Sequence, residues 1–163
     1  MEDKTTSVEK ENISNPTTEK KAGQERTASA NWAGNFKEGK GSISTQSGTL
    51  KKVNYSFKTR FENGEKGTNP EELLAAAHAG CFTMSVAAIL SKKGFNPTSL
   101  DTKAGVMMEG LKITTVHLSI TGSVPNISAD DFSEVVKEAE KKCLISEILN
   151  IPVTSEAKLS ASA

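Results

Sequence analysis

The sequence has no surplus of charge of either sign, because 20 lysine and arginine residues balance 20 aspartate and glutamate residues among 163 positions. A protein built mainly to bind nucleic acid carries a clustered basic surplus, so no nucleic-acid partner is expected. The chain also has only two cysteines, Cys81 and Cys143. Two are too few for the disulfide framework of a small secreted protein.

The first residues lack an apolar run as well. Met1 to Lys4 lead into a polar stretch, so no signal peptide is expected, and the cytoplasm, where thiols stay reduced, is the default location. Residues 1–26 are mostly Glu, Lys, Thr, Ser and Asn. Such a segment cannot bury enough surface to offset the entropy that it loses on ordering. We predict a disordered or loosely attached tail over residues 1–26 and one folded domain over residues 27–163.

Residues 73–90 contain no Asp, Glu, Lys or Arg. Before them, Asn69 is a favourable N-cap, Pro70 a favourable first helical residue, and the next two glutamates suit the positive first turn. We predict a helix that stops before Gly94. The run is barely long enough to span a bilayer, but it is alanine-rich and weakly apolar, so a buried central helix is expected and no membrane partner.

Strand patterns flank this helix. Residues 27–58 hold short β-prone runs between glycines and predict an antiparallel meander of two or three strands, and residues 59–68 predict a polar loop. After Pro97, apolar and polar residues alternate on both sides of Glu109-Gly110, which predicts a hairpin of half-buried strands.

The last part of the chain predicts a second helix and a final strand. Ser128 is a candidate N-cap, and apolar residues recur after it at helical spacing up to Cys143, which therefore lies on the core-facing stripe. Residues 153–159 alternate like a strand. The expected fold class is α+β, with antiparallel sheets around the buried central helix. One small sheet covers only one side of that helix, so a homodimer is expected.

The two cysteines are candidates for redox chemistry. Most intracellular cysteines are simply small buried hydrophobes. Here both lie on the buried faces of helices that should pack on one sheet, so they could face each other as attacking and resolving thiols must. A thiol buried in an apolar helix is inert unless a cation lowers its pKa. Arg60 could supply that cation and Glu71 could orient it in a bidentate pair, although a solvated loop arginine is the alternative.

Helix geometry limits how these groups can meet. Cys81 follows Glu71 by ten residues, which corresponds to about 15 Å along a straight helix. Glu71 therefore cannot touch the thiol of its own chain. If it acts near Cys81, it must come from a partner chain whose helix runs antiparallel across a twofold axis.

The two histidines are weaker candidates. His78 stands three residues before Cys81 and could help to hold a thiolate, but a hydrogen-bonded core histidine is the more common arrangement. His117 lies on the outward face of a predicted strand. The cysteines and histidines lack the short spacings of zinc sites, so no metal ligand is predicted.

The sequence resembles the OsmC family, the osmotically inducible relatives of the organic hydroperoxide resistance proteins, in three segments: GKGSISTQSGTL, FKTRFENGEKGTNPEELLAAAHAGCFTMS and AEKKCLISEIL. The resemblance runs from about Ala28 to Leu159. It is closer to the OsmC branch, because Arg60 directly precedes Phe-Glu and His78 stands where the other branch usually has tyrosine.

The resemblance implies an intertwined homodimer with active sites at the subunit interface and a thiol-dependent peroxidase without metal, haem or other cofactor. Cys81 resembles the peroxidatic cysteine and Cys143 the resolving one. Arg60 resembles the arginine that steadies the thiolate, and Glu71 the glutamate that pairs with it. The implied reaction reduces organic hydroperoxides, and hydrogen peroxide as well, through a Cys81 sulfenic acid and a Cys81–Cys143 disulfide that an external dithiol reduces.

One departure from the family pattern bears on this chemistry. Leu144 follows Cys143 where family members usually have proline. Without that proline, the helix could continue past Cys143 and change the rate of disulfide closure. Two other functions stay open: a dimer that binds a small apolar ligand, and a redox sensor whose thiols do not turn over.

Overall fold

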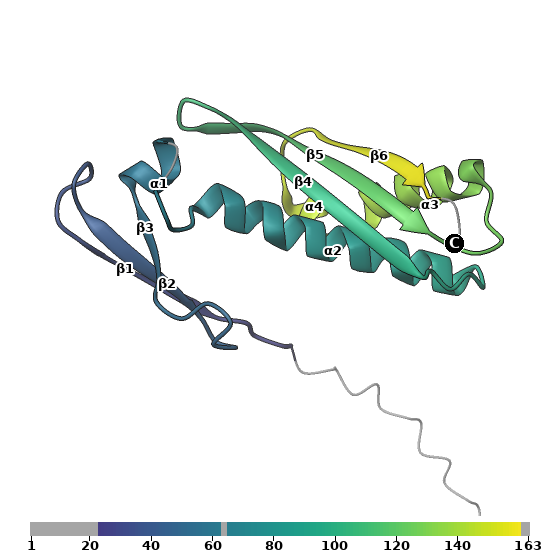
Figure 1. Ribbon diagram of the computed structural model, residues 1–163, viewed down its shortest axis with the longest axis horizontal. Helices are drawn as coiled ribbons and strands as arrows, with labels where there is room; N and C mark the ends of the chain where they lie inside the picture. The colour runs from purple at the N-terminus through teal and green to yellow at the C-terminus, as the bar shows by residue number, and fades with distance from the viewer. Residues whose placement is uncertain (1–22, 63–64, 161–163) are drawn as a thin grey trace, which may run out of the picture.

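The computed structural model describes residues 23–62 and 65–160, so most of the tail predicted over residues 1–26 lies outside the described residues, and that prediction stays untested. Three strands, β1 (Ala28–Ala33), β2 (Lys40–Thr45) and β3 (Val53–Ser56), form an antiparallel sheet in chain order. The predicted meander is confirmed. This first sheet stands apart from the rest of the chain (Figure 1).

A short helix, α1 (Phe57–Phe61), crosses the boundary between the predicted meander over residues 27–58 and the predicted loop over residues 59–68. The Ser56 hydroxyl accepts from the amide of Thr59 at 3.1 Å, and the Thr59 hydroxyl accepts from the amide of Ser56 at 2.8 Å. This reciprocal capping box satisfies two amides that a loop would leave free, and it corrects the prediction for residues 57–61. It also places Arg60 in the last turn of a helix.

The long helix α2 (Pro70–Lys92) has the predicted ends. Asn69 caps it by accepting from the amide of Glu72 at 2.8 Å, and the chain turns at Gly94, where φ is +84°. By length and composition α2 could cross a membrane, a test that the core helix of a soluble protein also passes. In the single chain only one face of α2 is fully buried.

The second sheet contains β4 (Ser99–Glu109), β5 (Lys112–Ser123) and β6 (Val153–Leu159) in that order. β4 and β5 form the predicted antiparallel hairpin. β6 pairs with β5 in parallel, so this sheet is mixed rather than wholly antiparallel. The reason is the connection, because two helices between β5 and β6 carry the chain back before β6 begins.

Those two helices are α3 (Ala129–Lys142) and α4 (Leu144–Ile148). Cys143 separates them with an extended backbone (φ −69°, ψ 123°). Its amide still donates to Ala139 at 2.9 Å, while its carbonyl accepts from Glu147 at 2.9 Å and begins α4. The helix therefore breaks at Cys143 even with Leu144 in place of proline, so the possible continuation past Cys143 does not occur.

The hydrophobic core lies between the second sheet and the helices α2 and α3 (Figure 1). Among the residues that the structure describes, none of its fully buried members belongs to the first sheet. They are Phe82, Val86, Ile89, Leu90, Val116, Leu118, Ile120, Val124, Ile127, Phe132, Val135, Val136, Ala139 and Cys143. The first sheet therefore gains no core packing within one chain.

Candidate active site

The fold brings the two cysteines together. Cys81 lies in the middle of α2 and is half-buried, whereas Cys143 lies between α3 and α4 and is fully buried. Both thiols are free, and they are close enough for each to change the pKa of the other. This proximity is what sequence reasoning expected of an attacking and a resolving thiol, whose individual roles stay predictions.

The two thiols differ in acidity. Burial raises the pKa of Cys81, the Ile145 amide opposes this, and the adjacent Cys143 raises the pKa further, so that with a last, smaller opposing effect of the Leu144 amide the pKa stays above its ordinary value. Burial also acts to raise the pKa of Cys143, but the Ser146 amide, the Cys81 thiol, the Ile145 amide and the Ser146 hydroxyl together bring it below its ordinary value. Within one chain, Cys143 is therefore the more acidic thiol.

Arg60 and Glu71 form the predicted bidentate pair. The Nε atom of Arg60 donates to both carboxylate oxygens of Glu71, at 3.0 and 3.1 Å, and its Nη2 atom donates to Oε1 at 2.6 Å. The Arg60 side chain is 31% exposed and the Glu71 side chain 11%. The Asn69 side chain also donates to the Thr59 carbonyl at 3.1 Å, which ties α1 to the start of α2.

This ion pair and the thiol pair lie in different places in one chain. Glu71 is in the first turn of α2, and Cys81 follows ten residues later in the same uninterrupted helix, about 15 Å along its axis. Arg60, held by Glu71, is not among the groups that shift the pKa of Cys81. The structure thus joins the four predicted site residues as two pairs and not as one cluster.

An apolar pocket of about 230 Å³ opens beside Arg60. Residues of the first sheet, its loops and α1 line it, together with the start of α2: Trp32, Phe36, Tyr55, Ser56, Phe57, Phe61 and Pro70. Sequence reasoning missed this pocket. The available signal was the crowding of five aromatic residues into positions 32–61 of a chain that has six Phe, one Trp and one Tyr.

The histidines lie as expected. His78 is fully buried in α2, and its Nε2 atom is 2.8 Å from the hydroxyl of Ser146. Burial lowers the pKa of His78 below 6.5. His117 faces outward on β5, where its Nδ1 atom is 2.7 Å from the hydroxyl of Thr154. Within residues 23–62 and 65–160, no three His, Cys, Asp or Glu side chains form a group that could hold a metal ion.

Comparison with known proteins assigns the family. The family described as OsmC-like protein matches residues 63–158. The chain is 44% identical over 136 residues to peroxiredoxin OsmC of Escherichia coli strain K12 and, equally, to that of Shigella flexneri, with 81% of this chain and 94% of each relative covered. It is 28% identical to the uncharacterised protein YmaD of Bacillus subtilis, over 80% of this chain and 91% of that relative. The chain belongs to the OsmC family.

Solved structures share the fold. An OsmC-like protein of unknown function from Vibrio cholerae superposes with a TM-score of 0.65 at 18% identity, over 82% of this chain and 99% of that chain. The organic hydroperoxide resistance protein OhrB of Bacillus subtilis superposes with a TM-score of 0.58 at 22% identity, over 82% of this chain and 98% of that chain. An OsmC-like protein from Mycoplasma pneumoniae superposes with a TM-score of 0.67 at 12% sequence identity, over 85% of this chain and 99% of that chain. The predicted α+β, OsmC-like fold is confirmed.

Proposed function

We propose that the protein is a thiol-dependent peroxidase that reduces organic hydroperoxides, and hydrogen peroxide as well. Membership of the OsmC family and 44% identity to a curated peroxiredoxin support the class, a cysteine-based peroxidase. The observation that carries the mechanism is the adjacency of two free thiols, one of them half-exposed. The cytoplasm is the proposed location, because this chemistry needs reduced thiols between turnovers.

In the proposed first step the Cys81 thiolate attacks one oxygen of the hydroperoxide. The S–O bond forms, the O–O bond breaks, and the alkoxide leaves and takes up a proton to become an alcohol. Cys81 is the better candidate for this step because it is half-buried, whereas Cys143 is fully enclosed and out of reach of a peroxide. Cys143 then closes a disulfide with the Cys81 sulfenic acid, and an external dithiol reduces it.

We propose that the apolar pocket beside Arg60 receives the organic part of the hydroperoxide. Its lining is almost wholly aromatic and apolar, which suits an alkyl or aryl group better than a small hydrated peroxide. The Arg60 guanidinium lies at the same pocket and over the ring of Phe61, 5.2 Å from the ring centroid. A hydroperoxide bound there has a cation beside its reacting end.

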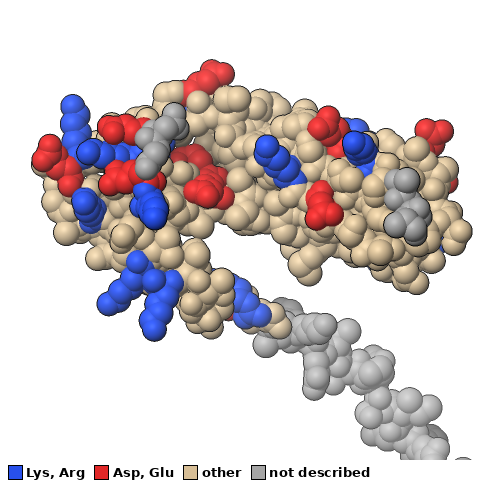
Figure 2. Space-filling model, in the orientation of Figure 1, with Lys and Arg blue, Asp and Glu red and all other residues tan. Residues whose placement is uncertain are grey.

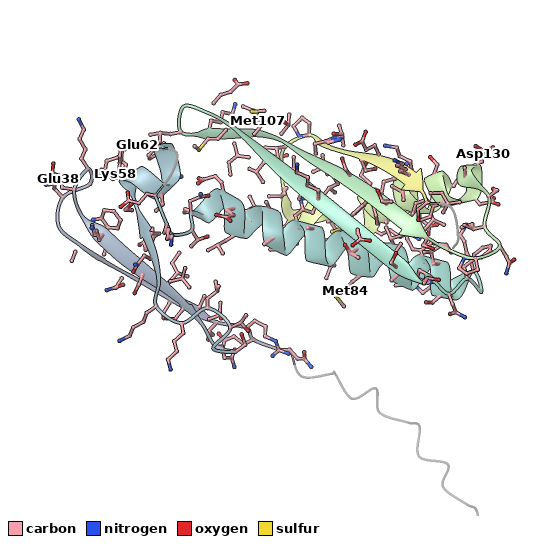
Figure 3. All side chains as sticks on the ribbon, in the orientation of Figure 1. Glu38, Lys58, Glu62, Met84, Met107 and Asp130 are labelled. Carbon is pink, nitrogen blue, oxygen red and sulfur yellow. The ribbon has the colours of Figure 1, made fainter. Side chains whose placement is uncertain are left out.

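This assignment requires a homodimer, because Arg60 does not lie at the Cys81 of its own chain. The exposed side of α2 supports a dimer as well. It carries uncharged residues at helical i, i+4 spacing, Ala76, Gly80, Met84 and Ala88. Met84 is 75% exposed and projects away from β4 and β5 (Figure 3). An antiparallel pair of α2 helices packed on this stripe would bring the start of one helix beside the middle of the other.

The first sheet fits the same proposal. It contributes nothing to the buried core of its own chain, and every residue of β1 is exposed. Charged side chains gather over this sheet and α1, whereas the middle of the molecule is largely uncharged in the same view (Figure 2). A partner subunit that packs on this middle region would bury the exposed stripe of α2.

Hydroperoxide consumption tests the proposed function. With an excess of dithiothreitol, the protein should consume many equivalents of cumene hydroperoxide, and hydrogen peroxide more slowly. Cys81→Ser should abolish consumption, while Cys143→Ser should complete one turnover and leave a sulfenic acid that dimedone traps. Equal loss of the first turnover in both variants would contradict the assigned roles. Failure of the unaltered protein to turn over would favour a ligand-binding or redox-sensing dimer.

A further inference from the structure

His78 is a fully buried ionisable side chain that the mechanism above does not use. It lies on the core face of α2, three residues before Cys81, and its Nε2 atom is 2.8 Å from the hydroxyl of Ser146 in α4. Its Nδ1 atom is buried and has no hydrogen-bond partner in the described part of the chain. Because burial lowers the pKa of His78, the ring is neutral at neutral pH.

One tautomer of the neutral ring fits these contacts. A proton on Nδ1 would bury an N–H group without an acceptor, which costs more than leaving a bare ring nitrogen unpaired. The proton therefore lies on Nε2 and is donated to the hydroxyl oxygen of Ser146. The hydroxyl hydrogen of Ser146 is then free to be donated to a third group.

Cys143 is the group placed to receive it. Ser146 lies in the first turn of α4, three residues after Cys143, which is the N-cap of that helix. The Ser146 hydroxyl is one of the groups that lower the pKa of Cys143. Of the two hydrogen-bonding directions open to Ser146, only donation to sulfur is compatible with a donating His78.

We propose that His78 is a positioning residue for the second thiol, and that its bond to Ser146 directs the Ser146 hydroxyl toward the sulfur of Cys143. The inference rests on the proposed peroxidase function, in which the Cys143 thiolate attacks the sulfur of the Cys81 sulfenic acid. An S–S bond forms, the S–O bond breaks, and the departing hydroxide takes up a proton to become water. Stabilising the Cys143 thiolate raises the fraction that can attack.

The same bond has a mechanical role. It links α2, which carries Cys81, to α4, which begins at Cys143. The chain has Leu144 where a proline would stiffen this junction, and the Leu144 side chain is 69% exposed, so it does not anchor α4 to the core. The part-buried contact between His78 and Ser146, together with the packing of Ile145 against the core, holds α4 beside the thiols.

The thiolate titration of Cys143 tests the proposal without any peroxide. Cys81, the titratable neighbour, is replaced by serine in every protein, and the ultraviolet absorbance of the Cys143 thiolate, which needs no reagent to reach the buried sulfur, is followed against pH. Ser146→Ala and His78→Phe should move the midpoint to higher pH, because the thiolate loses a hydrogen bond. Two matched controls should leave the midpoint close to that of the parent protein. They are Ser146→Thr, which keeps the hydroxyl, and His78→Gln, which keeps a donor.

The second measurement uses the chain with both cysteines and one equivalent of cumene hydroperoxide. Ser146→Ala should slow disulfide closure by about 2- to 10-fold, the scale of one lost hydrogen bond, while sulfenic acid forms at the unaltered rate. An unchanged titration midpoint in either Ser146→Ala or His78→Phe would overturn the proposal. If His78→Phe does not fold, His78→Leu, which also lacks a donor, replaces it. Because the titration needs no catalysis, failure of the peroxidase assay leaves this test intact.

Discussion

At the level of single residues, the thiol groups of Cys81 and Cys143 lie in different environments. Cys143 is enclosed and surrounded by polar groups of α4 that favour its thiolate, whereas Cys81 is reachable but burial disfavours its thiolate. A reactive Cys81 thus needs a positive charge, and none within residues 23–62 and 65–160 is among the groups that shift its pKa. This conflict between access and acidity is the strongest physical argument that the site is completed by a second subunit.

Burial of His78 makes stability depend on pH. The pKa of His78 is lowered in the folded chain, while in the unfolded chain it stays near 6.5. Between these values the unfolded chain binds more protons, so the free energy of unfolding is undiminished above about pH 6.5 and falls as the pH drops below it. The His78→Gln variant should lack the part of this fall in the free energy of unfolding that protonation of His78 causes. Urea denaturation at about pH 7.5 and about pH 5.5 measures it; identical pH dependence in both proteins would contradict the prediction.

At the scale of elements, α3 packs on β5 at one glycine. A Cβ atom added at Gly122 would lie 2.5 Å from the ring of Phe132 in α3 and 3.1 Å from the side chain of Leu100 in β4. We expect Gly122→Ala to lower the free energy of unfolding by about 1 to 3 kcal/mol, because the core cannot open without moving α3. Urea denaturation provides the measurement.

Gly105 in β4 is the matched control for that substitution. The atom nearest to an added Cβ there is the carbonyl oxygen of His117, at 4.0 Å. Gly105→Ala should leave stability unchanged or raise it slightly, since alanine restricts the unfolded chain more than glycine does. If the two substitutions had equal effects, tight packing between α3 and β5 would not be the cause.

Much of the fold could be predicted because its signals are local. Asn69 and Pro70 mark the start of α2, alternation marks β4, and the apolar stripe of α3 places Cys143 in the core. These features depend on neighbours within a few residues. The pairing of Arg60 with Glu71 spans eleven positions, and the family resemblance indicated it rather than any local pattern.

The remaining features depend on contacts between distant residues. The hydrogen bond between His78 and Ser146 joins positions 68 residues apart, and no spacing pattern in the sequence predicts it. The parallel pairing of β6 follows from the path of α3 and α4, and the alternation in residues 153–159 is the same for either direction. The sequence left open whether the helix breaks at Cys143 without a proline, because the contact of α4 with α2 joins residues far apart in the chain.

At the scale of the whole molecule, Gly80 lies at the centre of the exposed stripe of α2. Apart from its chain neighbours and the backbone of α2 itself, no atom of the described residues lies within 4 Å of a Cβ added there. Gly80→Leu should therefore stabilise a lone chain by about 1 kcal/mol through helix propensity, but it should weaken a dimer in which two α2 helices approach closely. Light scattering at low micromolar concentration should report a dimer for the unaltered protein and a shift toward monomer for Gly80→Leu. A Gly80→Leu dimer as stable as the parent would place the interface elsewhere.

We propose that Arg60 of one subunit activates Cys81 of the other, and heterodimers of marked chains can test this activation between subunits. Subunits with two different affinity tags are co-expressed, and the heterodimer is purified over both. In the first heterodimer one chain carries Arg60→Ala and the other Cys81→Ser. In the second, one chain is unaltered and the other carries both substitutions.

A site shared between subunits and a site within one subunit give opposite results. If the site is shared, the first heterodimer retains one complete site and should consume cumene hydroperoxide at roughly half the rate of the unaltered dimer, while the second retains none. If Arg60 acts within its own chain, the second heterodimer keeps about half the rate and the first falls to the low rate of Arg60→Ala. We expect the first pattern, and the second pattern would show that Arg60 acts within its own subunit.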